Sequence, residues 1–185
     1  FSQLDAGQPA DDLVREIVKG HDSIAALGVA SAIALKSETV SEATLALTSS
    51  QRLLSCDHDR MRHDFSRGTY GQPGASERRN RAELSHLIPR FVFSADSALR
   101  QRAKDAVLAF KDDPPFEYEE HRGSAEAQAA LSEEAAEYAE LVKQKNYKAY
   151  RTEEEGKVAI VHSNPLANTE ASQARIAESE RYLNT

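Results

Sequence analysis

Residue types that mark several common classes of protein are scarce in this chain of 185 residues. It has one cysteine, Cys56, one methionine and no tryptophan, and 6% of its residues are aromatic. A single cysteine excludes an internal disulfide and a zinc site built from several cysteines, and it is typical of a reducing compartment. We therefore expect a cytoplasmic protein.

Long apolar segments are also lacking. The longest uncharged apolar run, Ile24 to Leu35, has 12 residues and contains Gly28 and Ser31. A membrane-spanning helix needs about 20 apolar residues, so we predict no membrane span. The chain starts at Phe1 with no basic stretch followed by an apolar one, and we expect it to be a fragment of a longer protein.

The motifs of the commonest nucleotide-binding and hydrolytic sites are missing as well. The chain has no glycine-rich phosphate loop ending in Lys-Ser or Lys-Thr, no GxGxxG and no GxSxG, and we expect no cofactor. Apolar residues make up 40% and charged residues 29%, which is enough to build a core. The net charge of −7 argues against a generally basic nucleic-acid-binding protein.

Apolar residues recur with helical periodicity along most of the chain. We predict helices over residues 10–19, 22–36, 41 onward with a break near 48–50, 76–92 with a kink or break at Pro89, 95–111, 124–147 and 169–183. In the helix over 95–111 the apolar positions Leu99, Ala103, Val107 and Phe110 follow the strictest pattern. The β-branched segment 157–162 predicts a strand that pairs with residues 147–152.

These patterns predict a mainly α fold: an irregular stack of antiparallel helix pairs, either HEAT-like or a helical bundle, with a minor β-hairpin near 147–162. We expect residues 1–112 to form the helical pairs. Residues 113–185 would add an acidic helix, the hairpin and a C-terminal helix to the same globule.

Residues 86–110 resemble a HEAT-type helical repeat. The resemblance rests on Pro89 in the first helix, Asp96 in the turn, Arg100 early in the second helix, and Ala103 and Ala106 packed against the first. Three aspartates, Asp22, Asp59 and Asp96, are also spaced 37 residues apart. Repeats of this kind bury their apolar faces by stacking on neighbours. The alternative is an irregular helical domain, in which the equal spacing of the aspartates is a coincidence.

Two short motifs suggest chemistry. His58, Asp59 and His63 have residue types that bind divalent ions, and the order His21, His58-Asp59, Asp96 is similar to the H…HD…D pattern of HD-type metal phosphohydrolases. That resemblance implies a phosphohydrolase-like site at His58 and Asp59. The alternative is a solvated, charged turn between helices.

The second motif is Arg79-Asn80 followed by His86, which resembles the signature of the HEPN nucleases. The resemblance implies an RNA nuclease in which Arg79 binds phosphate and His86 moves a proton. The alternative is that Arg79 and His86 simply lie on an exposed, basic face of a helix.

Arginine is concentrated in one stretch of this acidic chain. Residues 60–90 hold seven arginines against three acids: Arg60, Arg62, Arg67, Arg78, Arg79, Arg81 and Arg90. We predict that this arginine patch binds an anionic ligand or RNA, unless it pairs with the acidic segment 111–155. The function favoured by the sequence is a non-catalytic helical interaction or scaffold module of a larger intracellular protein. Its partner would be another protein or the remainder of the parent chain.

Overall fold

The computed structural model of the protein describes residues 5–19, 23–66, 82–112, 124–152 and 158–166. In these residues the chain is mainly α-helical with one two-stranded antiparallel sheet, which confirms the expected fold class. The α-helices are α2 (Ala10–Val18), α3 (Ile24–Ser37), α4 (Glu42–Thr48), α5 (Gln51–Ser66), α7 (Leu87–Val92), α8 (Ser97–Leu108) and α9 (Ala125–Leu141). No helix in these ranges is long and apolar enough to cross a membrane.

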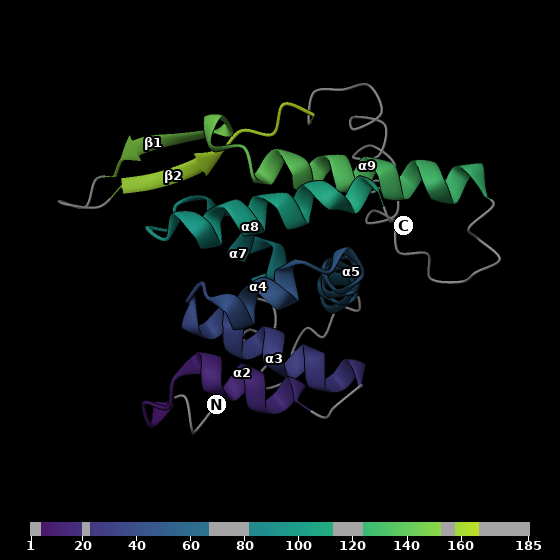
Figure 1. Ribbon diagram of the computed structural model, residues 1–185. Coiled ribbons are helices and arrows are strands. Elements are labelled where there is room, and N and C mark those ends of the chain that lie inside the picture. The colour runs from purple at the N-terminus through teal and green to yellow at the C-terminus, as the bar shows by residue number, and fades with distance from the viewer. Residues whose placement is uncertain (1–4, 20–22, 67–81, 113–123, 153–157, 167–185) are drawn as a thin grey trace.

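The helices follow one another as successive layers (Figure 1). Helices α2 and α3 pack together at one end, α4 and α5 lie above them, and α7 and α8 follow. Helix α9 packs on α8 and covers the other end, where the strands β1 (Tyr147–Arg151) and β2 (Val158–His162) extend from it. The strands pair in the register Tyr147–His162 to Arg151–Val158. The predicted hairpin is therefore present.

The break between α4 and α5 falls where the sequence predicts it. Ser41 caps α4: its hydroxyl accepts a hydrogen bond from the Thr44 amide, and the Thr44 hydroxyl accepts one from the Ser41 amide at 2.8 Å. This reciprocal capping box fixes where α4 begins. The helix ends at Thr48, and α5 begins at Gln51.

The segment around Pro89 differs from the prediction. Residues 82 and 83 are not helical, a 3-10 turn η1 (Leu84–His86) follows, and α7 begins only at Leu87. Pro89 is thus the third residue of α7, where a backbone N–H would have no partner within the helix. Proline does not interrupt a helix at such a position, so the break lies upstream of Pro89. Residues 76–81 lie outside the described ranges.

Helix α8 matches the prediction, whereas α9 ends six residues early. Helix α8 continues into the 3-10 turn η2 (Ala109–Lys111), so the two together cover 97–111 of the helix predicted over 95–111, which starts two residues late because Asp96 caps it. Helix α9 stops at Leu141, where the Tyr147 hydroxyl donates to the Leu141 carbonyl at 2.6 Å. A 3-10 turn, η4 (Gln144–Asn146), leads into β1. The helix predicted over 169–183 lies outside the described residues.

One apolar core runs through the described layers. Its largest fully buried apolar side chains are those of Phe91, Leu54, Leu84, Leu87, Ile88 and Val14. The predicted face of α8 is buried as well, with Leu99, Ala103, Val107 and Phe110 in the same core. Tyr138 of α9 packs its ring against Phe110, with centroids 5.9 Å apart and planes 84° apart. Residues from both predicted segments, 1–112 and 113–185, therefore contribute to one core.

The equally spaced aspartates occupy different positions. Asp96 caps α8 by accepting hydrogen bonds from the amides of Ala98 and Leu99 at 2.9 and 3.0 Å. Asp59 lies within α5 and is exposed, and Asp22 lies outside the described residues. Asp59 therefore does not mark a turn as Asp96 does. The HEAT resemblance of residues 86–110 remains a prediction.

Candidate functional site

Two members of the arginine patch have described side chains, and both are ion-paired. The Arg60 Nε donates to the Asp57 carboxylate at 2.9 Å, and the Arg90 guanidinium lies 2.8 Å from the Glu38 carboxylate. Arg62 lies on α5, but its side chain is outside the described part of the chain. The other four arginines, Arg67, Arg78, Arg79 and Arg81, also fall outside it. A continuous anion-binding surface on these residues therefore remains a prediction.

Arg60 takes part in a structural contact. Asp57, buried at 7% exposure, accepts hydrogen bonds from Arg60 and from the Leu84 backbone amide, the latter at 2.7 Å. This carboxylate links α5 to the start of η1. Asp57 is not among the predicted site residues, although the apolar residues Leu53 and Leu54 one turn earlier put it on the buried face of the helix.

The predicted metal ligands do not converge in the described residues. The His58 Nδ1 lies 3.3 Å from the Glu83 carboxylate, and Asp59 is exposed on the helix. Within the described ranges no group of three or more histidine, cysteine or acidic side chains is placed to hold a metal ion. The side chain of His63 is outside these ranges, so a site that includes it remains a prediction.

The predicted nuclease residues are not seen together. His86 is exposed at the end of η1, while Arg79 lies outside the described residues. The nuclease therefore stays a prediction.

Beside His58 runs an acidic groove of about 460 Å³ between α5, η1, α9 and the end of β2. Two of its acidic side chains, Glu83 and Glu134, have protein partners. Glu134 accepts hydrogen bonds from Gln51 at 3.1 Å and Ser55 at 2.7 Å, which hold α9 against α5. The hydrogen bond with His58 lowers the pKa of Glu83 below its usual value. Glu83 and Glu134 therefore contribute contacts between the helices on either side of the groove.

The hairpin carries the largest concentration of exposed apolar side chains in the described residues. Tyr150, Val158, Ile160 and Val161 are each about half exposed, at 51%, 59%, 52% and 49%; we call them the hairpin surface. Directly paired residues of an antiparallel sheet share a face, and neighbours along a strand alternate. The register therefore puts Val158 and Ile160 on one face, and Tyr150 and Val161 on the other.

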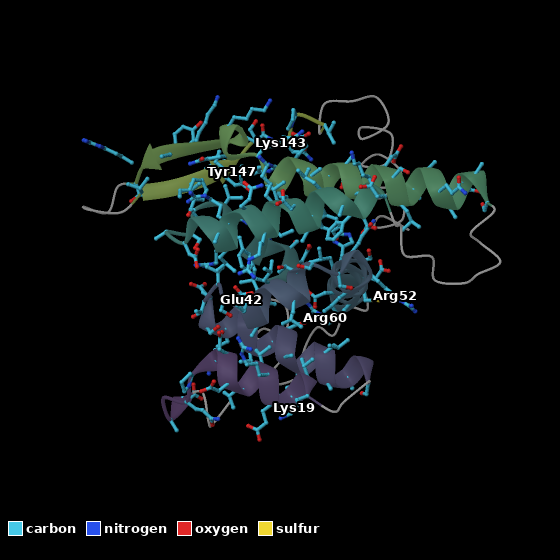
Figure 2. The ribbon with its side chains drawn as sticks, in the orientation of Figure 1. Lys19, Glu42, Arg52, Arg60, Lys143 and Tyr147 are labelled. Carbon is cyan, nitrogen blue, oxygen red and sulfur yellow. The ribbon has the colours of Figure 1, made fainter. Side chains whose placement is uncertain are left out.

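The base of the hairpin is held firmly to the helices. Tyr147 packs edge-on against Phe93, with ring centroids 5.2 Å apart, and burial raises the pKa of its hydroxyl to about 12. Asn146 donates to the Glu140 carboxylate at 2.8 Å and to the Glu140 carbonyl at 3.0 Å. The outer part of the hairpin is exposed, while its base is fixed. Figure 2 labels Tyr147 beside Lys143 at this junction.

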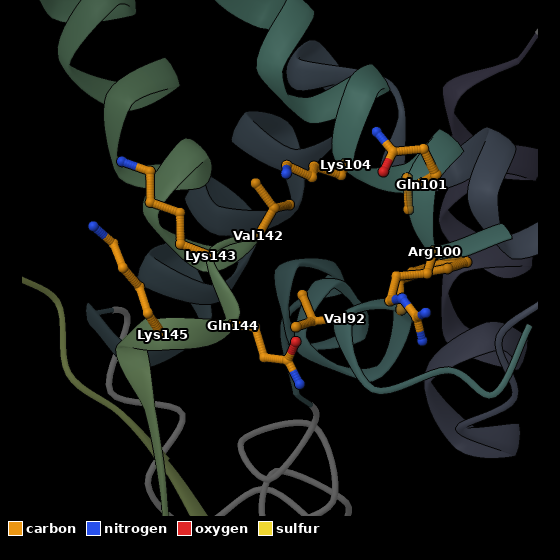
Figure 3. Close-up of a pocket in the computed structure, with 10 residues that line it drawn as sticks. Val92, Arg100, Gln101, Lys104, Val142, Lys143, Gln144 and Lys145 are labelled. Carbon is orange, nitrogen blue, oxygen red and sulfur yellow. The ribbon is translucent and has the colours of Figure 1, made fainter. Parts of the chain in front are cut away.

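A pocket of about 340 Å³ opens next to this junction, between α7, α8 and the turn after α9. Its floor is apolar and its rim is basic; we call it the basic pocket. The residues that line it are Phe91, Val92, Arg100, Gln101, Ala103, Lys104, Val142, Lys143, Gln144 and Lys145. Figure 3 shows Lys143 and Lys145 on one side of the pocket, Arg100 and Gln101 on the other, and Val92 and Val142 between them.

This pocket is not predictable from the sequence, because its cations come from distant parts of the chain. Arg100 and Lys104 are one turn apart on α8, whereas Lys143 and Lys145 follow α9 about 40 residues later. In the sequence the two later lysines belong to the strongly acidic segment 111–155. The spacing of Arg100 and Lys104 on one helix face is the one local signal.

Comparison of the chain with protein-family models, with curated proteins and with solved structures finds no match.

Proposed function

We propose that this protein is a non-catalytic interaction module of a larger protein, and that it binds an extended segment of a protein partner along its β-hairpin. The observation that carries the proposal is the hairpin surface. Four large apolar side chains are half exposed on two short strands, whereas the exposed apolar residues Val18 and Val29 stand on helices at the opposite end of the fold. Clustered exposed apolar side chains mark interaction sites, and scattered ones do not.

Apolar residues on both faces favour a strand as the partner. A helix laid on the hairpin would cover one face, leaving either Val158 and Ile160 or Tyr150 and Val161 in water. A strand added to the sheet edge places its alternate side chains on both faces and extends both apolar surfaces.

The backbone of the hairpin supports the same partner. The sheet has two strands in the described part of the chain, so each strand there has one edge without a neighbouring strand. An isolated two-stranded sheet is marginally stable in water, and an added strand supplies backbone hydrogen bonds along the edge. Tyr147 and Asn146 fix the base of the hairpin against α9, so its edge is held in place before a partner binds.

The test begins by identifying the partner segment. A photo-crosslinking residue at position 150, incorporated in the full-length parent protein, would attach to the segment that lies along the hairpin. That segment is then synthesised as a peptide, and its dissociation constant is measured with wild type and with a variant carrying Val158→Thr, Ile160→Thr and Val161→Thr. Threonine keeps the β-branched shape and the strand propensity.

We expect the triple variant to weaken binding by about tenfold or more, because each buried CH2-sized group contributes about 0.8 kcal/mol. Val29→Thr, a matched change on α3 at 51% exposure, should leave the dissociation constant unchanged. Equal binding by the triple variant, a helical bound peptide, or a crosslink to a second copy of this chain would each contradict the proposal.

A further inference from the structure

The basic pocket gathers positive charge that the fold leaves largely uncompensated. Four of its lining residues are cationic: Arg100, Lys104, Lys143 and Lys145. Lys143 pairs with the Glu140 carboxylate, and this contact holds the pKa of Glu140 below its usual range. The other three cations form no ion pair in the described part of the chain, although Lys145 is close enough to Glu140 to help lower the pKa of that carboxyl.

The contacts of these three cations are few. Among the described residues, Lys104 and Lys145 have no ion-pair partner, and Arg100 donates one hydrogen bond, to the Ser94 carbonyl at 2.7 Å. That bond is to a neutral oxygen and leaves the guanidinium charge uncompensated. Like charges gathered around one hollow repel each other, so an anion bound between them would be attracted by all three.

The floor of the pocket limits what kind of anion fits. Phe91, Val92, Ala103 and Val142 are all buried and apolar. Low-dielectric walls strengthen the field of the rim cations inside the hollow, and they offer contact to an apolar or planar group. The amides of Gln101 and Gln144 add hydrogen-bonding groups at the rim. The volume, about 340 Å³, lies in the range of small-molecule sites.

We propose that the basic pocket binds a small organic phosphate: a molecule of nucleotide size with two or more negative charges and an apolar part. Arg100 matches the geometry of a phosphate group with its planar donors, while Lys104 and Lys145 act as point charges on either side. The apolar part rests on Val92 and Val142. This site is separate from the hairpin surface, so the proposal for the pocket does not depend on the proposed function.

The test measures binding to the purified chain by calorimetry at low salt, with ATP, pyrophosphate and adenosine as probes. We expect ATP to bind more tightly than pyrophosphate, which lacks the apolar part, and adenosine, which lacks the charge, to show no binding. The ATP affinity should fall steeply as salt is raised from 20 to about 300 mM, because screening shortens the reach of the rim charges.

A double variant, Lys104→Gln with Lys145→Gln, should weaken ATP binding by about tenfold or more, since it removes two charge-assisted contacts. The matched control is Lys19→Gln with Arg52→Gln, which removes two exposed cations remote from the pocket (Figure 2). Melting temperatures of both variants verify that each is folded.

Three results would overturn the proposal. They are no binding of ATP or pyrophosphate at low salt, equal affinity of the pocket variant and the control, and tighter binding of a tetraglutamate peptide than of ATP. The last result would assign the pocket to an acidic protein segment instead.

Discussion

Asp57 is the buried carboxylate that joins α5 to the turn before α7. Its oxygens accept hydrogen bonds from the Arg60 Nε and the Leu84 amide. Asp57→Ala would leave a buried amide and a half-buried guanidinium without this acceptor. We expect the free energy of unfolding to fall by about 3–5 kcal/mol, measured by urea denaturation.

Asp59→Ala provides the matched control. Asp59 is two residues away on the same helix and is exposed, so its removal should change the free energy of unfolding by about 0.5 kcal/mol or less. If both variants lost the same amount of stability, the structural role assigned to Asp57 would be wrong.

Protonation of Glu83 should lower the stability of the protein at acidic pH. Its hydrogen bond with His58 lowers its pKa in the folded state below 4.5, the value expected of an unpaired glutamate. Near pH 4 the unfolded chain therefore binds more protons than the folded chain. The contribution of ionised Glu83 to the free energy of unfolding is complete above about pH 4.5, and it is lost as the pH falls through the pKa of Glu83 in the folded state. We expect Glu83→Gln and His58→Gln each to lose less stability than wild type between pH 6 and pH 3.5, as measured by urea denaturation. A pH dependence identical to wild type in both variants would count against the pairing.

Single residues were the hardest level to predict from the sequence. The residue types of His58 and Asp59 predict metal binding, whereas in the described residues the carboxylates that join elements are those of Asp57 and Glu83. Each step along a helix turns by about 100°, so Asp57 and Asp59, two positions apart, point in nearly opposite directions: Asp57 is buried and Asp59 is exposed. The partner of His58 lies 25 residues away, and no local spacing points to it.

At the scale of elements, α8 shows how much one capping residue contributes. The Asp96 carboxylate accepts hydrogen bonds from the Ala98 and Leu99 amides at the start of the helix. We expect Asp96→Ala to lower the free energy of unfolding by about 1 kcal/mol, while Asp96→Ser, which keeps a side-chain acceptor, should lose clearly less. The measurement is a pair of urea denaturation curves, and equal losses in the two variants would exclude a capping role.

Most elements were predictable because their signals are local. Helical periodicity and the capping residues Ser41 and Asp96 determine where α4 and α8 begin. The end of α9 was not predictable, because the groups that satisfy its last carbonyls come from Asn146 and Tyr147 beyond the helix. Pro89 was misleading for a related reason: proline breaks the interior of a helix, but α7 begins only two residues before it.

At the scale of the molecule, the surfaces with a proposed role depend on tertiary packing. The basic pocket forms because α8 and the end of α9 lie together, which puts Lys104 near Lys145. The hairpin surface is predictable only in part: the sequence predicts strands over 147–152 and 157–162, but not that their outer part projects from the helices. Which side of a strand is exposed depends on what packs against it.

The molecule should unfold as one cooperative unit, and Tyr138 tests this. Tyr138 lies on α9 but packs against Phe110 in the core that continues through α8 to α2 and α3. Replacing a buried aromatic ring with alanine costs about 3–5 kcal/mol. In Tyr138→Ala we expect the slowest-exchanging amides of α3 and of α8 to lose protection by the same free energy, measured by hydrogen exchange, because a cooperative unit opens as a whole. Tyr150→Ala, which removes a ring that is 51% exposed on β1, should leave both sets nearly unchanged. Loss of protection confined to α8 and α9, with α3 unaffected, would instead show that the layers unfold separately despite the shared core.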